Sequence, residues 1–167
     1  CGMATNPENA YRNGTMYSSY TAASFARKYA LADSFNINFK GAVSWSFEFE
    51  NQPWFYGFRD LATNGVNKPV LNVFRMFGMM KGKRVLVKGS NMVWNYHDDD
   101  QNIEEETEVD VRITGVPGRQ ITITEYRIDR EHANSYEAWK KMGSPQNPTA
   151  AQIKELEDAS ELKTTGK

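Results

Sequence analysis

Residues 41–58 constrain the fold most, because they pass from an apolar strand-like run into a loop of carboxylates, amides and aromatic rings. The run from residue 42 to residue 47 is rich in β-branched and aromatic side chains, which predicts a strand. Glu48, Glu50 and Asn51 follow at once. In parallel α/β sheets and barrels, ligands bind just beyond the carboxyl ends of strands. We therefore expect a binding site at this strand end, with the side-chain types that suit a sugar.

Composition narrows the classes of protein. A chain of 167 residues with 40% hydrophobic composition can bury one real core or two small ones, which excludes disorder for most of it. The net charge of −1, with an acidic cluster near residue 100, argues against a nucleic-acid partner, which would need a basic stripe. No apolar run approaches the roughly 20 residues of a membrane span. The aromatic content of 13% exceeds what a small core needs, and planar rings stack on sugars or bases.

The ends of the chain suggest the interior of something longer. The sequence begins at Cys1 with neither an initiator methionine nor the basic and apolar regions of a signal peptide. Any signal peptide would lie upstream, so the compartment stays open between cytoplasmic and periplasmic or secreted. The single cysteine, Cys1, cannot form an internal disulfide and leaves the redox environment open as well.

The order of the elements predicted in the first half of the chain is typical of a parallel α/β unit. Residues 1–14 are polar and predict a loop, and Thr15 is the expected N-cap of an amphipathic helix over residues 16–33. A second helix is expected from Pro69, because apolar residues recur at i, i+3, i+4 and i+7 from Val70. Helix, strand, long loop and helix in this order favour a parallel sheet over an antiparallel sandwich.

After Gly82 the pattern changes to short alternating runs at residues 84–88, 91–96, 108–114 and 120–128. Each has one apolar and one polar face, which predicts antiparallel strands that need another layer. Helical spacing returns from Tyr136 to Met142. Thr149 is the expected cap of a last helix that continues through residue 159.

Four separated motifs carry a family resemblance. WSFEFENQPWFYGFRDL at residues 45–61, KPVLNVFRM at 68–76, VWNYHDDD at 93–100 and YRIDREHANSYEAWKKMGSPQ at 126–146 resemble glycoside hydrolase family 39. The best-known members of this family are β-xylosidases, which act in xylan degradation. The motifs come in the family's order and span nearly the whole chain.

The resemblance implies a retaining glycosidase with a (β/α)8 TIM barrel and an accessory β-sandwich. Residues 1–82 would be the C-terminal β/α units of the barrel, and residues 83–167 most of the antiparallel sandwich with its helices. In the family the acid/base glutamate lies on the fourth barrel strand and the nucleophilic glutamate on the seventh. Both would lie upstream of Cys1, so no catalytic residue is expected in this chain.

Glu48 and Glu50 are candidates for the catalytic pair on spacing alone. On one strand they share a face with backbones roughly 6.5–7 Å apart, and a retaining mechanism needs carboxyl groups about 5–5.5 Å apart. However, neighbours on one strand approach the sugar from one side, whereas the mechanism places the sugar between its two carboxyl groups. We therefore interpret Glu48 and Glu50 as substrate-binding residues, with Trp45 as an apolar floor under the ring.

Several residues have two readings. Trp54 is a further candidate for substrate contact, but it and its neighbours Phe55 and Tyr56 either line the site mouth or pack the loop. The acidic run after His97 lacks the spacing of a calcium loop and reads as a charged hairpin tip. The two histidines have no partners at zinc-ligand spacing, so neither a metal nor a cofactor is expected. The methionines at positions 76, 79 and 80 are expected to fill the core.

Two classes of function follow. The first is a piece of a β-xylosidase-like enzyme that acts on xylo-oligosaccharides or other β-glycosides and needs the missing N-terminal barrel portion as its partner. The second is a carbohydrate-binding or structural β-sandwich module without catalysis. Neither predicts a nucleic-acid or membrane partner, and the oligomeric state stays open.

Overall fold

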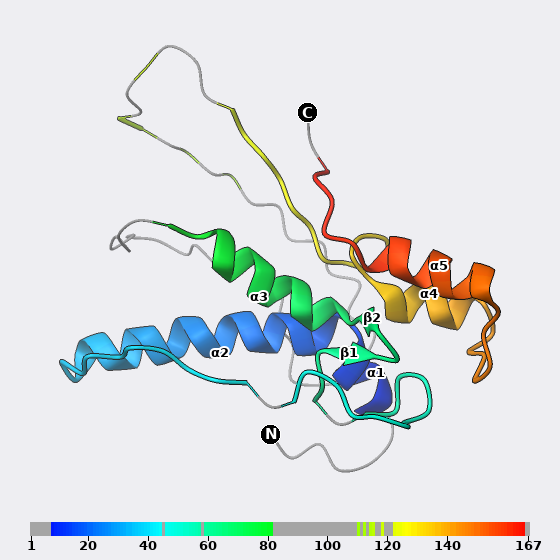
Figure 1. The fold of residues 1–167 in the computed structure, drawn as a ribbon. Coiled ribbons are helices and arrows are strands. Elements are labelled where there is room, and N and C mark those ends of the chain that lie inside the picture. The colour runs from blue at the N-terminus through cyan, green and yellow to red at the C-terminus, as the bar shows by residue number, and fades with distance from the viewer. Residues whose placement is uncertain are drawn as a thin grey trace.

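The computed structural model describes residues 8–44, 46–57, 59–81, 110, 112, 114, 115, 118 and 122–165. Its elements in chain order are α1 (Glu8–Asn13), α2 (Thr15–Ser34), β1 (Ala62–Thr63), β2 (Val66–Asn67), α3 (Pro69–Met79), α4 (Ser135–Lys141) and α5 (Ala150–Ser160). The long helix α2 lies beside α3, and α4 lies beside α5 on the other side of the β1–β2 hairpin (Figure 1). No helix in these described parts is long and apolar enough to cross a membrane.

The N-terminal helix α1 corrects the prediction of a loop over residues 1–14. The polar sequence of these six residues predicts a loop, but they form a helix. The Asn13 side-chain amide donates to the Asn9 carbonyl and to the Asn9 side chain, one helical turn back. The same amide donates to the Phe55 carbonyl at 2.8 Å in the protein interior. A tertiary hydrogen bond that the local sequence does not reveal therefore holds this helix. Gly14, and not Thr15, occupies the N-cap position of α2.

Helix α3 confirms the prediction of a second helix. Pro69 stands in its first turn, where the missing N–H costs nothing, and Val70 and Val73 are buried. Phe74 meets Phe25 of α2 edge to face at 5.9 Å, and this contact joins the two helices. The expectation that the methionines fill the core is wrong for Met79 and Met80, because both are exposed beyond the last packed turn.

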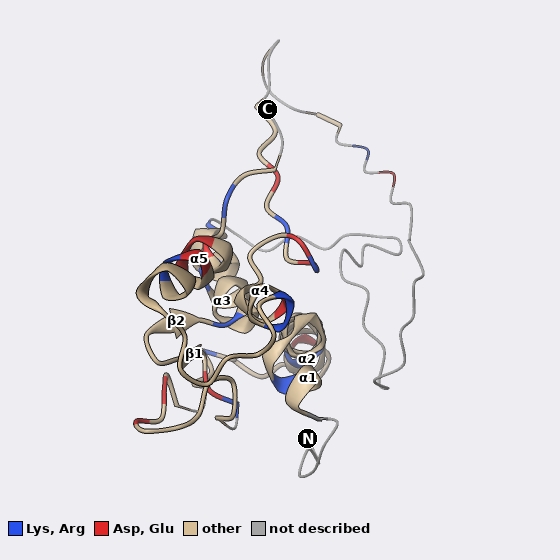
Figure 2. Cartoon of the chain, turned by 90° about the vertical axis from the view of Figure 1, so that its right-hand side faces the viewer, with Lys and Arg blue, Asp and Glu red and all other residues tan. Residues whose placement is uncertain are grey.

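The C-terminal helices lie where the sequence predicts helices, and α5 has the predicted cap, Thr149. The side chain of Asn134 accepts the N–H of Glu137 at the start of α4. Thr149 and Gln152 form a reciprocal capping box at the start of α5. On α5 the buried side of the helix carries Leu156, while the acidic residues face solvent (Figure 2).

One hydrophobic core joins both parts of the chain. It consists of Trp54, Phe55, Val66, Tyr136, Trp139 and Leu156. Polar contacts cross the same junction: Ser135 Oγ donates to the Asn67 carbonyl at 2.6 Å, and Asn72 Nδ2 donates to the Ser160 carbonyl at 2.8 Å. Helices α4 and α5 therefore pack directly on the hairpin and on the first turns of α3.

The predicted barrel strand over residues 42–47 has no strand partner among the described residues. Residues 42–44 and 46–47 are irregular there, and the Val43 side chain is 99% exposed. Most of the four predicted sandwich strands lie outside the described residues; at their edge Tyr126 pairs antiparallel with Thr164 in an isolated bridge. The barrel, the sandwich and the boundary between residues 82 and 83 therefore stay predictions.

A buried ion pair fixes the start of α3. Lys68 and Asp60 have side-chain exposures of 0% and 2%, and the Lys68 ammonium donates to Asp60 Oδ1. Burial lowers the pKa of Lys68, and the Asp60 carboxylate opposes that shift. Gly57 makes room for this carboxylate, because a Cβ at Gly57 would overlap Asp60 Oδ2. The pair connects the long loop to the residue that precedes α3.

Replacing Lys68 by Met tests this pair. The variant leaves the buried Asp60 carboxylate uncompensated, and we expect the free energy of unfolding in urea to fall by about 3–5 kcal/mol. A second replacement, Asp60→Leu, should restore much of the loss because it removes the orphaned charge. Lys163→Met breaks an exposed pair with Glu161 and serves as the control, with a change of less than about 1 kcal/mol. Equal losses of unfolding free energy in Lys68→Met and Lys163→Met would contradict a special role for the buried pair.

Candidate functional site

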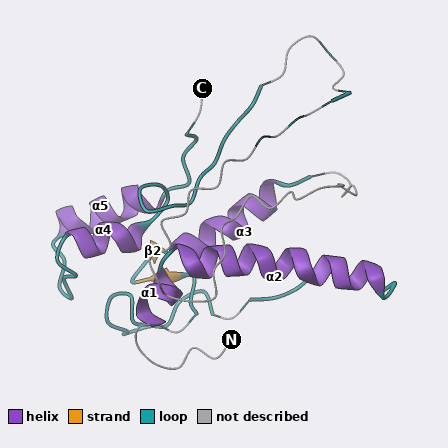
Figure 3. Cartoon of the chain, turned by 180° about the vertical axis from the view of Figure 1, so that it is seen from behind, coloured by secondary structure: helices purple, strands orange, loops and turns teal. Residues whose placement is uncertain are grey.

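The loop between α2 and β1 carries the candidate site and contains no helix or strand in its described residues (Figure 3). Its middle is nevertheless held firmly by backbone contacts. The Phe47 carbonyl accepts the N–H groups of Leu61 and Ala62 at 2.8 and 2.9 Å. One side-chain contact follows directly: Glu48 Oε1 accepts the N–H of Gly65 at 2.9 Å. The segment around Glu48 is therefore anchored on the β1–β2 hairpin.

The hairpin tip is a two-residue turn. Ala62 pairs with Asn67 and Thr63 with Val66, which leaves Asn64 and Gly65 as the connection. Their φ angles of 45° and 83° lie in the left-handed region, as a type I′ turn requires. Asn-Gly is the strongest short hairpin signal in a sequence, so this element could have been predicted from the residues alone.

An open depression of about 480 Å³ lies between the loop and the hairpin tip. It is lined by Ser46, Phe47, Glu48, Glu50, Asn51, Asn64 and Gly65. The lining combines two carboxylates, two side-chain amides and one aromatic ring, and the Phe47 side chain is 56% exposed. These groups can accept and donate hydrogen bonds to a polyhydroxylated ligand and offer a flat apolar surface beside them.

The structure brings two of the predicted site residues together. Glu48 and Glu50 both line the depression, the first half-buried and the second exposed. Trp45 lies outside the described residues, so its role as an apolar floor stays a prediction. Phe47, Asn51 and the hairpin tip complete the lining and were not predicted as site residues.

Of the two interpretations of Trp54, packing of the loop or substrate contact, its burial favours packing. Its side chain is 7% exposed and belongs to the hydrophobic core. Gln146 bonds both backbone groups of Trp54: its side-chain oxygen accepts the N–H at 2.9 Å, and its amide donates to the carbonyl at 3.4 Å. A large ring gains more from burial against Phe55 and α4 than from exposure, and the sequence around Trp54 gives no sign of these distant partners.

The neighbours of Trp54 resolve the two open readings of the loop. Phe55 is fully buried and lies 5.0 Å from Trp139 between ring centroids, so it packs the loop. Tyr56 is exposed but does not line the depression. Asn51, Phe55 and Arg59 have φ angles of 58°, 57° and 56°, a costly left-handed conformation for residues other than glycine. The surrounding contacts hold this strained loop in place, as is common beside binding sites.

Metal chemistry has no candidate centre in the described part of the chain. No group of three or more histidine, cysteine, aspartate or glutamate residues there could hold a metal ion. The acidic run that follows His97 lies outside the described residues.

A model of a known family matches the C-terminal part of the chain. Residues 88–166 match the model of Glycosyl hydrolases family 39, which confirms the predicted family for the C-terminal part of the chain. No solved structure matches this chain. The match supports a glycoside hydrolase, and hence a glycoside as substrate. The matched segment contains α4 and α5, which pack on the hairpin, but not the residues that line the depression.

Replacing Gly65 by Ala tests the geometry of the hairpin tip. A Cβ at Gly65 meets no atom within 4 Å, so the cost comes only from the φ of 83° and should be about 1–2 kcal/mol of unfolding free energy. Gly41→Ala is the matched control, because its Cβ also meets nothing and its φ lies outside the left-handed region. We expect the control to change stability by less than about 0.5 kcal/mol. A neutral Gly65→Ala variant in thermal or urea unfolding would contradict the assigned turn.

Proposed function

We propose that this chain, whose C-terminal part matches glycosyl hydrolases family 39, is part of a retaining glycosidase that acts on β-xylosides. The depression at the hairpin tip would form one wall of its sugar subsite. The supporting observation is that the family-matched helices form one core with other residues of the loop and hairpin that carry this wall. Gln146 bonds the loop at Trp54, and Ser135 bonds the hairpin at Asn67.

The lining residues suit a neutral sugar. The Glu48 carboxylate has one oxygen held by Gly65, so its second oxygen can accept a hydrogen bond from a ring hydroxyl without losing its orientation. Glu50 can accept from a neighbouring hydroxyl, and the amide of Asn51 can donate to one. The exposed ring of Phe47 offers an apolar contact beside these polar groups.

Glu48 and Glu50 bind in this proposal and do not catalyse. Both belong to the same loop wall, whereas a retaining mechanism needs the sugar between its nucleophile and its acid/base group. If the family resemblance holds for the whole enzyme, those two glutamates would lie on barrel strands outside this chain. Exposed apolar side chains support a missing partner surface: Leu31, Phe35 and Ile37, around the end of α2, are 49%, 71% and 60% exposed. We propose that the remainder of a (β/α)8 barrel covers them, with the β-sandwich formed by the C-terminal part.

A carbohydrate-binding module is the second candidate. The depression has the groups needed to hold a sugar, and both carboxylates among its described lining residues, Glu48 and Glu50, come from one loop segment, which is also what a non-catalytic module would offer. The two functions differ in catalysis, since only the enzyme turns over a glycoside. They also differ in that only the enzyme needs another polypeptide segment to be active.

An aryl β-xyloside assay tests the proposal that this chain binds the sugar while the catalytic residues lie outside it. We expect no turnover by the 167-residue chain above the rate without protein, because the two catalytic carboxylates lie elsewhere. Turnover by this chain would overturn the proposal that the catalytic pair is absent from it. Turnover that appears when the upstream barrel portion is joined to it would favour the enzyme over the module.

Sugar binding at the depression is tested by titrating xylobiose into the purified protein and following NMR chemical shifts. Glu48→Gln removes the charge from the held carboxylate, and we expect the dissociation constant to rise about three- to tenfold, for the loss of one charge-assisted hydrogen bond. Glu155→Gln on the exposed side of α5 is the matched control and should leave binding unchanged. The same effect in both variants would count against the depression as the sugar site.

A further inference from the structure

The dipeptide Asn-Gly occurs twice in this chain, as Asn13-Gly14 and as Asn64-Gly65. In this dipeptide the asparagine side-chain amide precedes a backbone nitrogen that no Cβ of the next residue shields, so the nitrogen can attack the carbon of the amide. The attack needs local movement of the backbone, and the structure around each copy therefore controls its rate. The two copies carry the same reacting groups in different surroundings.

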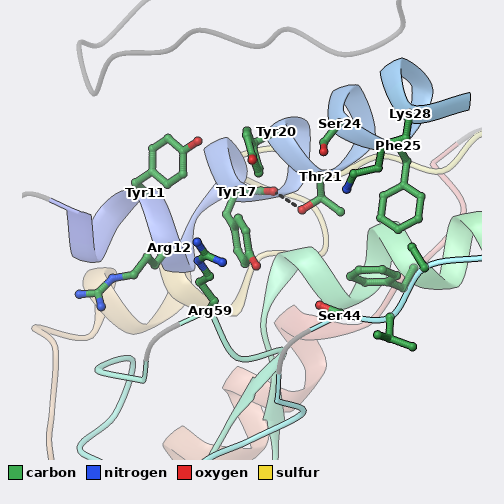
Figure 4. Close-up of a pocket in the computed structure, with 13 residues that line it drawn as sticks. Tyr11, Arg12, Tyr17, Tyr20, Thr21, Ser24, Phe25, Lys28, Ser44 and Arg59 are labelled. Carbon is green, nitrogen blue, oxygen red and sulfur yellow. Dashed lines mark hydrogen bonds between the residues drawn. The ribbon is translucent and has the colours of Figure 1, made fainter. Parts of the chain in front are cut away.

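The first copy, Asn13-Gly14, is buried where α1 meets α2. Asn13 is 1% exposed, and its side-chain amide donates to the Phe55 carbonyl. The Gly14 nitrogen donates its N–H to the Ala10 carbonyl at 2.8 Å. Residues on both sides of the dipeptide line a cavity of about 220 Å³ beside α2, among them Tyr11, Arg12 and Tyr17 (Figure 4). Reaction of this copy would require α1 to open and to give up these contacts.

The second copy, Asn64-Gly65, is the exposed tip of the β1–β2 hairpin. The hydrogen bond from Asn64 Nδ2 to the Gln52 carbonyl is long, at 3.4 Å, and is exposed to solvent. A Cβ at Gly65 would meet nothing within 4 Å, so the backbone there is open to approach. Opening an exposed two-residue turn disturbs fewer packed groups than opening α1 and costs less free energy.

One contact opposes reaction at the hairpin tip. Glu48 Oε1 accepts the N–H of Gly65 at 2.9 Å. The attacking nitrogen must lose this proton, and the adjacent carboxylate disfavours the negative charge that develops on the nitrogen. The same hydrogen bond also holds the nitrogen in the turn. Glu48 therefore slows the attack by its charge and by its position.

We propose that Asn64 is a site of spontaneous deamidation and that Glu48 restrains the reaction. The Gly65 nitrogen bonds to Cγ of Asn64, the bond from Cγ to Nδ2 breaks, and Nδ2 leaves as ammonia with the proton of the Gly65 N–H. The product is a cyclic imide, which water opens. Opening at Cγ gives aspartate, whereas opening at the backbone carbonyl gives isoaspartate, in which the main chain runs through the former side chain.

The two products change the hairpin tip differently. Aspartate preserves the turn, because Asp-Gly also favours type I′, but it adds a carboxylate to those of Glu48 and Glu50 in the depression. Isoaspartate lengthens the main chain by a methylene group, which does not fit a two-residue turn between the paired residues Thr63 and Val66. The reaction itself does not rest on the proposed sugar site.

Incubation of the purified protein in mildly alkaline buffer, followed by trypsin digestion and tandem mass spectrometry, tests the proposal. Cleavage after Arg12 and Arg59 places the two dipeptides in different peptides. We expect Asn64 to convert at least about tenfold faster than Asn13, because Asn13 reacts only after α1 has opened. In concentrated urea the two rates should become similar. Equal rates in the native protein, or an Asn64 amide that lasts as long as that of Asn13, would overturn the proposal.

Variants of Glu48 test the restraint. Glu48→Ala should speed the conversion of Asn64 several-fold and leave the rate at Asn13 unchanged. Glu48→Gln keeps an acceptor for the Gly65 N–H without the charge and should fall between. Glu50→Ala is the matched control, because it removes a carboxylate from the same depression but leaves the bond to Gly65. No acceleration in Glu48→Ala, or the same acceleration at both asparagines, would overturn the role of Glu48.

Discussion

The buried ion pair between Lys68 and Asp60 is the interaction on which the rest of the described structure depends. Two full charges without water are tolerated only when each meets the other, so the loop and the residue before α3 must stay at a fixed separation. The β1–β2 hairpin lies between the two partners in the chain, and the pair therefore closes it at its base. The ion pair therefore also fixes the position of the hairpin tip. The Glu48 carboxylate is fixed with it, because it accepts the N–H of Gly65 at this tip.

Elements with strong local signals could be predicted from the sequence. Pro69 marks the start of α3, and Thr149 with Gln152 marks the start of α5, because these groups satisfy helix ends through neighbours in the chain. Helix α1 could not be predicted in this way. Its stability depends on the hydrogen bond from Asn13 to Phe55, 42 residues away, which no local pattern encodes.

In the candidate site, too, some residues have a local sequence signal and others depend on contacts that are distant in the chain. Glu48 and Glu50 were predicted because polar groups after an apolar run stand out in any sequence. Asn64 and Gly65 reach the depression only through the fold of the hairpin, although their Asn-Gly turn carried a readable signal. Trp54 kept two interpretations at the level of sequence, because its packing partners on α4 come from a distant part of the chain. Trp45 and most of the sandwich strands lie outside the described residues, so what the residue pattern and the family resemblance indicate for them stays a prediction.

The reciprocal bonding between Gln146 and Trp54 has a consequence for how the two parts of the chain are joined. A peptide group in a sheet offers one acceptor and one donor to its neighbour, and here the amide of a glutamine side chain supplies both to a single loop residue. The Gln146 side chain thus pairs with Trp54 as a residue of a neighbouring β-strand would, although no second strand is involved. A glutamate at this position would still accept from the Trp54 N–H, but it would set a negative charge against the Trp54 carbonyl. The family-matched part of the chain is therefore joined to the loop by a contact that uses both the acceptor and the donor of one side-chain amide.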